Sequence, residues 1–137
     1  MVKRLVKKVL LDSNFLFLPI SRGINIVDEV ENLLNSKVEF LVLKPVIDEL
    51  KKVASKKRGL KLKKQAQFAL KLSEKFSKLN FNNCGNVDDC LVKAAVKLKC
   101  LVATGDMELR KKLRKVGVPV IYPRKKIKKL VLEGYVD

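Results

Sequence analysis

Apolar residues form short runs of strand length, and amphipathic segments fill the intervals between these runs. The apolar runs cover residues 5–11, 38–43, 100–103 and 118–122. Between them, apolar side chains recur every three or four positions, which is the spacing of one helix face. Strands that alternate with helices are typical of a parallel sheet covered by helices. The pattern therefore predicts an α/β fold.

Residues that favour helix ends mark out the expected helices. Asparagine and proline stand where helices begin, and glycine stands where they end. Two helices are expected to begin at Asn25 and at Pro45. Three further helices are expected over residues 60–79, 87–99 and 105–117. The tail over 124–137 alternates basic and apolar residues, so it is expected to pack, but it favours neither helix nor strand.

Length and charge narrow the class of protein. The chain has 137 residues, of which 47% are hydrophobic, so we expect one domain over residues 1–137. It carries 31 Lys and Arg against 14 Asp and Glu, a formal charge of +17. This excess indicates a polyanionic partner, with nucleic acid ahead of an anionic membrane surface. No apolar run is long enough to span a bilayer, so we expect a soluble, cytoplasmic protein with no membrane partner.

Residues that are absent or few exclude several chemistries. Histidine is absent, which excludes histidine bases and histidine-ligated metals. Neither common Gly-rich phosphate loop occurs. Cys84, Cys90 and Cys100 are odd in number and lack CxxC spacing. We therefore interpret them as buried or unreactive thiols in a reducing cytoplasm.

Acidic residues follow the predicted strands. Asp12 follows the first strand and Asp106 follows the strand over 100–103, while Asp88 and Asp89 begin the helix after a long loop. Ligands of open parallel sheets bind outside the carboxyl ends of the strands. These acids are therefore expected to face one crevice.

Helical periodicity selects among neighbouring acids. In "PVIDEL", Glu49 falls at the edge of the apolar face, whereas Asp48 points to water. In the next acidic helix, Asp88 falls near the boundary of the apolar face and Asp89 nearly opposite to it. The candidate catalytic residues are Asp12, Glu49, Asp88 and Asp106.

Each acid has a structural explanation when it is taken alone. Asp12 and Asp106 could cap helices, the acids at the helix start favour its positive end, and Glu49 could pair with Lys52. Their joint placement at one sheet edge, in a chain so poor in acids, favours a shared site. Clustered carboxylates repel unless protons or a cation lie among them, and all-oxygen ligands suit Mg²⁺ or Mn²⁺. Such an ion can activate water against a phosphodiester, which indicates a nuclease.

Two basic runs suggest where nucleic acid binds. Residues 51–64 hold eight basic residues and residues 110–129 hold ten, and neither run contains an acid. A solvated helix face or a thermophile's composition would also give such runs, but binding to a phosphate backbone is the functional interpretation. The RNA-binding candidates are Lys51, Lys52, Lys56, Lys57, Arg58, Arg110 and Arg124.

The motifs "LLDSNFL", "PVIDEL", "VDDCLV" and "VATGDMELRKKLRKVGVPVIY" occur in this order. In their order and spacing they resemble the PIN-domain nucleases, and most closely the archaeal branch similar to the endonuclease that cleaves small-subunit precursor ribosomal RNA. The resemblance covers essentially the whole chain. It implies a three-layer α/β/α sandwich with a central parallel sheet and RNA cleavage with Mg²⁺ or Mn²⁺.

The resemblance also implies roles for individual residues. The four acids of the family match Asp12, Glu49, Asp88 and Asp106, with Asp89 as an adjacent metal ligand. The supporting polar positions are Ser13, Asn14 and Thr104; Ser13 stands where the family more often has threonine.

These observations predict a divalent-metal-dependent endoribonuclease acting on ribosomal or structured RNA. Two alternatives stay open: a catalytically weak RNA-binding scaffold in ribosome assembly, and a VapC-type toxin ribonuclease. The partner is expected to be RNA. The resemblance leaves a homodimer, ribosome-assembly factors and an antitoxin open as further partners.

Overall fold

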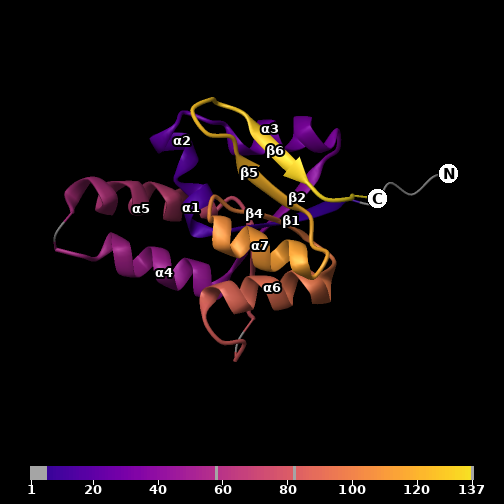
Figure 1. Cartoon of the computed structure of the whole chain (residues 1–137). Coiled ribbons are helices and arrows are strands. Elements are labelled where there is room, and N and C mark those ends of the chain that lie inside the picture. The colour runs from indigo at the N-terminus through magenta and orange to yellow at the C-terminus, as the bar shows by residue number, and fades with distance from the viewer. Residues whose placement is uncertain (1–5, 58, 82, 137) are drawn as a thin grey trace.

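A mostly parallel sheet forms the centre of the protein (Figure 1). The structure, a computed structural model, describes residues 6–57, 59–81 and 83–136. Within these residues, six strands form one sheet in the order β3-β2-β1-β4-β5-β6. The strands are β1 (Lys7–Leu11), β2 (Val38–Leu43), β3 (Ser77–Leu79), β4 (Leu101–Ala103), β5 (Val120–Pro123) and β6 (Leu130–Glu133). All neighbouring strands pair in parallel except β5 and β6, which are antiparallel.

Helices cover both faces of the sheet. They are α1 (Ser13–Leu16), α2 (Leu18–Ser21), α3 (Ile26–Leu34), α4 (Lys44–Ala54), α5 (Leu60–Ser73), α6 (Val87–Leu98) and α7 (Met107–Lys115). The α6 and α7 helices lie together on one side of the sheet and α3 lies on the other, while α4 and α5 form a projecting pair (Figure 1). This arrangement confirms the predicted α/β/α fold. In the described ranges, no helix combines the length and apolar character that crossing a bilayer requires.

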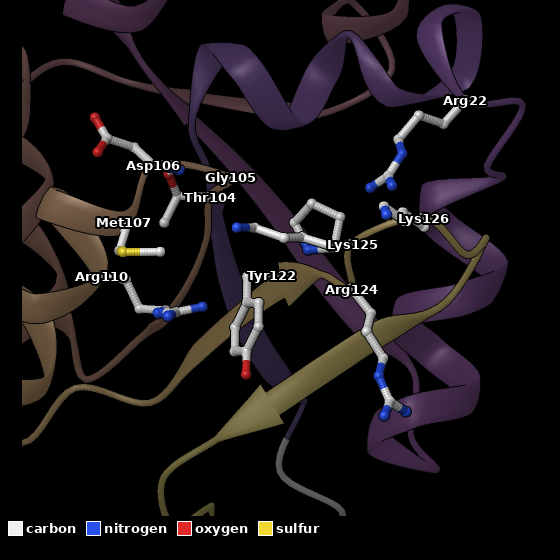
Figure 2. A pocket seen from close by; sticks show the side chains of 11 residues that line it. Arg22, Thr104, Gly105, Asp106, Met107, Arg110, Tyr122, Arg124, Lys125 and Lys126 are labelled. Carbon is white, nitrogen blue, oxygen red and sulfur yellow. Dashed lines mark hydrogen bonds between the residues drawn. The ribbon is translucent and has the colours of Figure 1, made fainter.

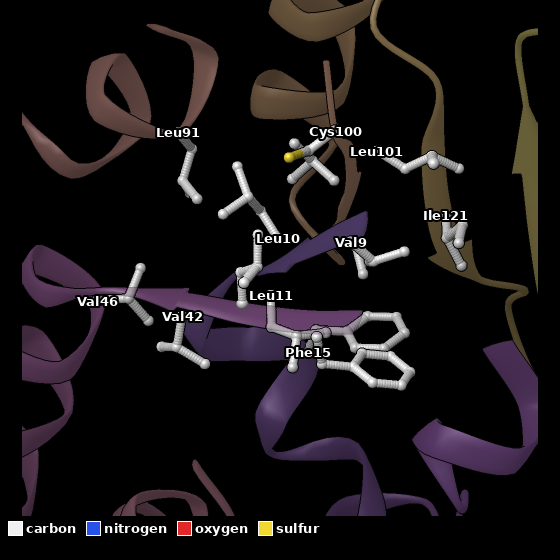
Figure 3. Close-up of a cluster of buried hydrophobic side chains, with 14 of the residues drawn as sticks. Val9, Leu10, Leu11, Phe15, Val42, Val46, Leu91, Cys100, Leu101 and Ile121 are labelled. Carbon is white, nitrogen blue, oxygen red and sulfur yellow. The ribbon is translucent and has the colours of Figure 1, made fainter. Parts of the chain in front are cut away.

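The central strand β1 organises the hydrophobic core. Val9, Leu10 and Leu11 are completely buried, as expected for a parallel strand covered on both faces. Side chains from the neighbouring strands and from the helices on both faces pack around them (Figure 3). Burying such side chains stabilises the fold by about 1.5–3 kcal/mol each. This burial fixes the register of β1 and therefore the position where β1 ends.

The strand order reverses direction at β1. The chain leaves β1 to form β2 on one side and later returns to form β4 on the other. Such a switch point leaves a crevice at the carboxyl ends of the two central strands. Asp12 directly follows β1, and its amide N–H donates a 3.0 Å hydrogen bond to the carbonyl oxygen of Ala103 at the end of β4. The crevice therefore begins at Asp12.

The expected helix over 60–79 is wrong in its last third. The α5 helix ends at Ser73, whose hydroxyl donates a 2.6 Å hydrogen bond to the carbonyl of Leu70, and tight turns follow. Phe76 then packs against Phe40 of β2, with ring centroids 5.3 Å apart. This contact helps to bring the next residues into the edge strand β3. Tertiary packing thus overrides the helical periodicity of this segment.

Two other segments differ from the expectations. The residues directly after Asp12 form the short helices α1 and α2, which the apolar pattern does not predict. The tail folds as a β-hairpin: β6 pairs antiparallel with β5, and Lys126 adopts a positive φ of 66° in the turn between them. Within the tail, the strand covers only Leu130–Glu133, and the basic residues before it lie in the turn.

Candidate active site

Asp12 lies at the bottom of the crevice with both carboxylate oxygens engaged. Its side chain is only 5% exposed. Asp12 Oδ1 accepts a 2.8 Å hydrogen bond from the amide of Ser13, and Oδ2 accepts one of 2.7 Å from the hydroxyl of Thr104. Asp12 is also the N-cap residue of α1, so the capping explanation is correct as far as it goes. A cap does not require a buried carboxylate, however, because most caps face water.

Thr104 and Asn14 join the ends of β1 and β4. Thr104 is fully buried, and its hydroxyl accepts a 3.0 Å hydrogen bond from the amide of Asp106 while donating to Asp12. Asn14 Oδ1 accepts a 2.8 Å hydrogen bond from the amide of Gly105. These bonds fix the two loops that follow the central strands relative to each other.

Glu49 reaches the crevice from α4. This helix starts immediately after β2, so its second turn lies beside the end of the sheet. The hydroxyl of Ser13 donates a 2.6 Å hydrogen bond to Glu49 Oε1, whereas the neighbouring Asp48 is exposed. The structure therefore places Glu49 on the crevice side of the helix and links it to the residue that follows Asp12.

Asp88 and Asp89 lie in the first turn of α6, but their carboxylates do not cap it. The N-cap is Asn86, whose side-chain oxygen accepts a 2.8 Å hydrogen bond from the amide of Asp89. The Asp89 carboxylate lies against Gly85, because a Cβ on Gly85 would come within 2.8 Å of Asp89 Oδ2. Capping therefore leaves the half-buried Asp88 carboxylate unused.

Asp106 combines a capping role with a position beside the crevice. Its Oδ1 accepts hydrogen bonds of 2.8 and 3.4 Å from the amides of Glu108 and Leu109, at the start of α7. Its own amide donates to Thr104, as described above. The cap thus fixes the Asp106 carboxylate within the same hydrogen-bonded unit as Asp12.

The acids form one electrostatic cluster. Burial raises the pKa of Asp12 to about 6; hydrogen bonds from Thr104 and the amide of Ser13 oppose this rise, and the charges of Glu49 and Asp88 add to it. The pKa of Asp88 is also raised, first by burial and then by the charge of Asp106. The positive charge of Lys112 lowers the pKa of Asp88, whereas the carboxylates of Glu49 and Asp89 raise it further. The charges of the neighbouring acids therefore favour the protonated forms of Asp12 and Asp88.

The donor chemistry fits a hard divalent cation. A cation among these acids would stabilise the charged forms of Asp12 and Asp88, whose pKa values are raised. Across the described ranges, no three His, Cys, Asp or Glu side chains converge closely enough to form a ready metal cage. Magnesium usually keeps several waters and uses only one or two carboxylates. The cluster thus fits a largely hydrated ion and not a closed protein cage.

A basic pocket lies directly beside the acids (Figure 2). It has a volume of about 620 Å³ and begins at Thr104, Gly105 and Asp106. Two predicted RNA-binding residues, Arg110 and Arg124, line it. The other basic side chains of its lining are Arg22, Lys125 and Lys126. Arg22 stands alone in the sequence, so only the tertiary fold reveals its place here.

The other predicted RNA-binding residues lie on the α4 side of the molecule. Lys51 and Lys52 are exposed on the last turns of α4, and Lys56 and Lys57 are exposed in the segment that follows. Arg58 falls outside the described residues. The two basic runs are thus carried by different elements, and only the second of them lines the pocket.

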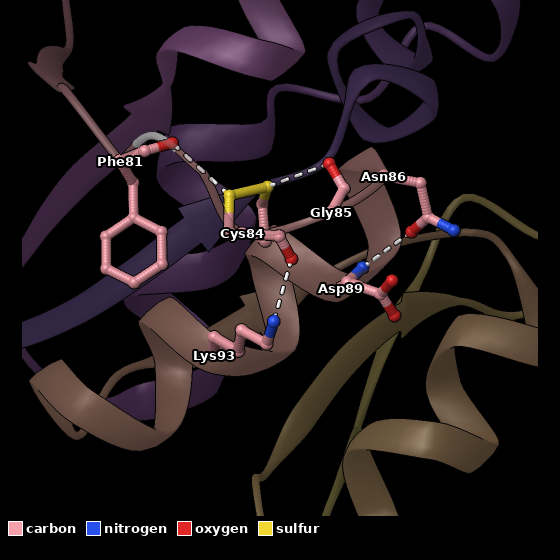
Figure 4. Close-up of a disulfide and its surroundings, with 7 residues drawn as sticks. Phe81, Cys84, Gly85, Asn86, Asp89 and Lys93 are labelled. Atoms are coloured by element: carbon pink, nitrogen blue, oxygen red, sulfur yellow. Dashed lines mark hydrogen bonds between the residues drawn. A yellow bond between two sulfur atoms is a disulfide. The ribbon is translucent and has the colours of Figure 1, made fainter.

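The prediction of three free thiols is wrong. Cys84 and Cys90 form a disulfide, with their Cα atoms 5.0 Å apart (Figure 4). Cys100 is a buried free thiol. The loop before α6 folds back onto the first turn of the helix, which brings Cys84 within reach of Cys90. Lys93 Nζ also donates a 3.0 Å hydrogen bond to the carbonyl of Cys84. The disulfide therefore closes a ring of backbone that contains Asp88 and Asp89.

Comparison with known proteins gives consistent matches over most of the chain. The chain is 34% identical to Ribonuclease VapC4 of Methanocaldococcus jannaschii, over 87% of this chain and 92% of that protein. It is 33% identical to the rRNA-processing protein FCF1 of Saccharomyces cerevisiae, over 83% of this chain and 58% of that protein. The solved structure of the PIN domain endonuclease Utp24 matches with a TM-score of 0.78 at 27% identity, covering 95% of this chain and 93% of that one.

The family assignment rests on the length of the match as well as on these relatives. Residues 9–126 match the family described as PIN like domain. This range contains all the acids described above, and the match confirms the resemblance that the sequence motifs indicate. The chain belongs to the PIN like domain family.

Proposed function

We propose that the protein is a divalent-metal-dependent endoribonuclease that acts on ribosomal or other structured RNA. The observation that carries the proposal is the cluster at the switch point, where Thr104 and Ser13 tie the carboxylates of Asp12 and Glu49 to the ends of the central strands. A fold gains no stability from bringing like charges together in a buried crevice. Similarity to a ribonuclease and to a PIN endonuclease supports the same conclusion.

In this proposal the acids hold Mg²⁺ or Mn²⁺. The residues that would hold it are Asp12, Glu49, Asp88 and Asp106, with Asp89 as an adjacent ligand. When bound, such an ion supplies an activated water and positive charge for the phosphodiester. The chain itself orients the carboxylates: Thr104 holds Asp12, Ser13 holds Glu49, and the capped start of α7 holds Asp106.

The basic residues are proposed to hold the RNA backbone. Lys51, Lys52, Lys56 and Lys57 are exposed on the α4 side, and Arg110 and Arg124 line the pocket beside Asp106. Contacts of this kind position the strand without reading its sequence. They also make binding depend steeply on salt, so tests of activity belong at low ionic strength.

Two relatives suggest different RNA targets. The match to FCF1, named for rRNA processing, supports ribosomal precursor RNA as the target and ribosome-assembly factors as partners. The match to Ribonuclease VapC4 over most of its length supports a toxin-type ribonuclease restrained by an antitoxin. Cleavage assays that offer precursor rRNA, mature rRNA and tRNA separately would distinguish the two, because a processing enzyme selects the precursor.

The primary test is cleavage of a labelled single-stranded RNA at low salt, with Mn²⁺ and with EDTA. We expect cleavage that requires both the metal and Asp12, so that the Asp12→Asn protein is inactive. Glu49→Gln and Asp48→Asn form a matched pair, since the two acids are adjacent on α4 but only Glu49 contacts Ser13. Glu49→Gln should lower the rate at least tenfold, while Asp48→Asn should not.

RNA that binds equally to the wild-type and Asp12→Asn proteins but stays intact with Mn²⁺ would contradict the nuclease proposal. The protein would then be an RNA-binding scaffold with the PIN fold. Equal activity of the Glu49→Gln and Asp48→Asn proteins would instead show that α4 contributes no ligand, and would leave Asp12 and Asp106 as the centre of the site.

A further inference from the structure

The pocket beside Asp106 is built by the C-terminal hairpin. Tyr122 and Arg124 come from β5 and its end, and Lys125 and Lys126 from the turn before β6. The opposite wall comes from Arg22 in the loop after α2. The hairpin turn touches this loop, because a Cβ on Gly23 would come within 3.3 Å of Lys128 Nζ. The pocket therefore lies between the hairpin and the loop after α2.

Among the described residues, the basic side chains of the pocket have no ion-pair or hydrogen-bond partner. In the described portion of the chain, the ion pairs are Lys111 with Glu108 and Arg114 with Glu133, and neither pair belongs to the pocket. No side-chain hydrogen bond involves the five pocket cations within those same ranges. The one acid of the lining, Asp106, already accepts two amide hydrogen bonds through Oδ1.

The arrangement of these cations favours a bound anion. Figure 2 shows Arg22 and Lys126 at the side of the pocket away from Asp106, while Lys125 extends toward Thr104. Basic side chains that line one pocket without ion-pair partners repel one another. Gathering them therefore does not stabilise the fold. A phosphate would neutralise them, and Arg side chains bind phosphate oxygens through two parallel hydrogen bonds.

One pair of side chains adds a flat surface to this charge. The Arg110 guanidinium lies over the Tyr122 ring, 4.0 Å from its centroid. The Arg110 amide donates a 3.0 Å hydrogen bond to the carbonyl of Asp106, so the stacked pair lies one helical turn from the acid cluster. RNA-binding proteins stack bases on aromatic rings and on arginine planes. The pocket thus offers both a phosphate site and a stacking surface.

We propose that this pocket binds one nucleotide of the RNA strand next to the phosphodiester that is cut, holding its phosphate with Arg110 and Lys125 and its base against the Arg110–Tyr122 stack. The inference rests on the proposed nuclease function, and it identifies where the strand runs: from the acid cluster across Gly105 toward the β5–β6 turn. The family match ends at residue 126, inside that turn, so β6 lies beyond it.

The test measures RNA binding without catalysis. Short fluorescent single-stranded RNA is titrated in EDTA with the wild-type protein, with Arg110→Gln/Lys125→Gln and with Lys8→Gln/Lys97→Gln. The control pair likewise removes two cations, Lys8 and Lys97, which are exposed on the side of the sheet where the strands begin. We expect the pocket variant to bind at least tenfold more weakly and the control variant to change less than twofold. The salt slope of the pocket variant should fall by about 0.7, because the two side chains hold one phosphate and each phosphate contact on a single strand contributes about 0.7.

A second arm locates the phosphate. A set of RNAs, each with one uncharged methylphosphonate linkage at a different position, is bound to the wild-type and pocket variants. One linkage should weaken binding to the wild-type protein and have little further effect on the pocket variant. Equal weakening by the pocket and control variants, or the same linkage profile for both proteins, would overturn the inference.

The outcome is separable from that of the nuclease proposal. If the wild-type protein cleaves RNA with Mn²⁺ but the pocket variant binds RNA normally, the nuclease proposal stands and the pocket inference fails. A different result would be that no protein cleaves RNA, while the pocket variant binds RNA more weakly and no longer responds to the one sensitive linkage. The pocket would then be an RNA-binding site, and the nuclease proposal would fail.

Discussion

The hydroxyl of Thr104 donates a 2.7 Å hydrogen bond to Asp12 Oδ2, although the two residues are 92 positions apart in the sequence. The bond forms because β1 and β4 are neighbours in the sheet and each residue directly follows its strand. Thr104 also accepts the amide hydrogen bond of Asp106. A single buried hydroxyl thus joins two of the proposed catalytic acids.

Thr104→Val should therefore impair the site while keeping the shape of the side chain. Asp12 and the Asp106 amide each lose a partner, which should cost about 1–3 kcal/mol of unfolding free energy and about 10- to 100-fold in metal-dependent rate. The Thr104 bond also opposes the rise in the pKa of Asp12. The acidic limb of the pH–rate profile should consequently move to higher pH.

Thr104→Ser is the matched control, because it keeps the hydroxyl and removes only a methyl group. It should restore most of the rate and the wild-type pH profile. A Val variant with a normal pH profile and only reduced thermal stability would show that Thr104 acts in folding alone.

Asp12 should make the metal-free protein less stable at neutral pH. Its pKa is raised from 3.8 to about 6 on folding, so the folded state holds the proton more tightly than the unfolded chain does. This contribution to stability is fully present below pH 3.8 and is lost as the pH rises through 6. The cost above that pH is about 3 kcal/mol, from 1.36 kcal/mol per pKa unit.

Asp12→Asn removes this titration. In EDTA the variant should have the higher free energy of unfolding at pH 7.5, and its advantage should disappear toward pH 4. Chemical denaturation across this range measures both curves, with Asp48→Asn as an exposed control. A constant difference between wild-type and Asp12→Asn proteins at all pH values would contradict the raised pKa.

Adding Mn²⁺ should reverse this order of stability. An ion that binds only the folded state at 1,000 times its Kd stabilises it by about 4.1 kcal/mol, which exceeds the cost of the charged Asp12. The melting temperature of the wild-type and Asp48→Asn proteins should rise with Mn²⁺ and return to the starting value with excess EDTA. Asp12→Asn and Asp106→Asn should show little rise. Equal shifts in all four proteins would place the ion elsewhere.

Asp88 and Asp89 should differ in importance despite being adjacent. Asp88 is coupled electrostatically to Asp106 and Glu49, whereas the Asp89 carboxylate lies against Gly85 in the loop. Asp88→Asn should lower the metal-dependent cleavage rate at least tenfold, and Asp89→Asn should lower it less. Single-turnover rates with saturating protein compare the two. A larger loss in Asp89→Asn would make Asp89 the main ligand from α6.

The sequence predicts the parts of this protein that depend on local pattern. The buried strands, the start of α3 at Asn25 and the orientation of Glu49 all follow from apolar spacing and capping residues. The end of α5 does not, because the contact of Phe76 with Phe40 is tertiary. The hairpin at the C-terminus does not follow from local pattern either, because β6 forms through its antiparallel pairing with β5.

The pocket and the disulfide show a second limit. Arg22 reaches the pocket through the fold, about a hundred residues from the basic run that supplies the rest of it. Cysteine spacing alone does not show that the loop before α6 turns back toward Cys90. Chemistry that is assembled from distant segments requires the topology, whereas chemistry placed at strand ends is visible in the pattern.

The disulfide should stabilise the loop that leads into Asp88. Cys84 and Cys90 are six positions apart, and closing so short a ring stabilises a fold by about 2 kcal/mol in the chain-entropy description. Thiol titration of the unfolded, oxidised protein should detect Cys100 alone, and reduction should expose two further thiols.

Reducing agent should lower the melting temperature of the wild-type protein and leave that of the Cys84→Ser/Cys90→Ser protein unchanged. The same treatment should slow metal-dependent cleavage by the wild-type protein, because the loop on one side of Asp88 is released. Three reactive thiols in the untreated protein, or equal melting temperatures with and without reductant, would show that the disulfide does not form in solution.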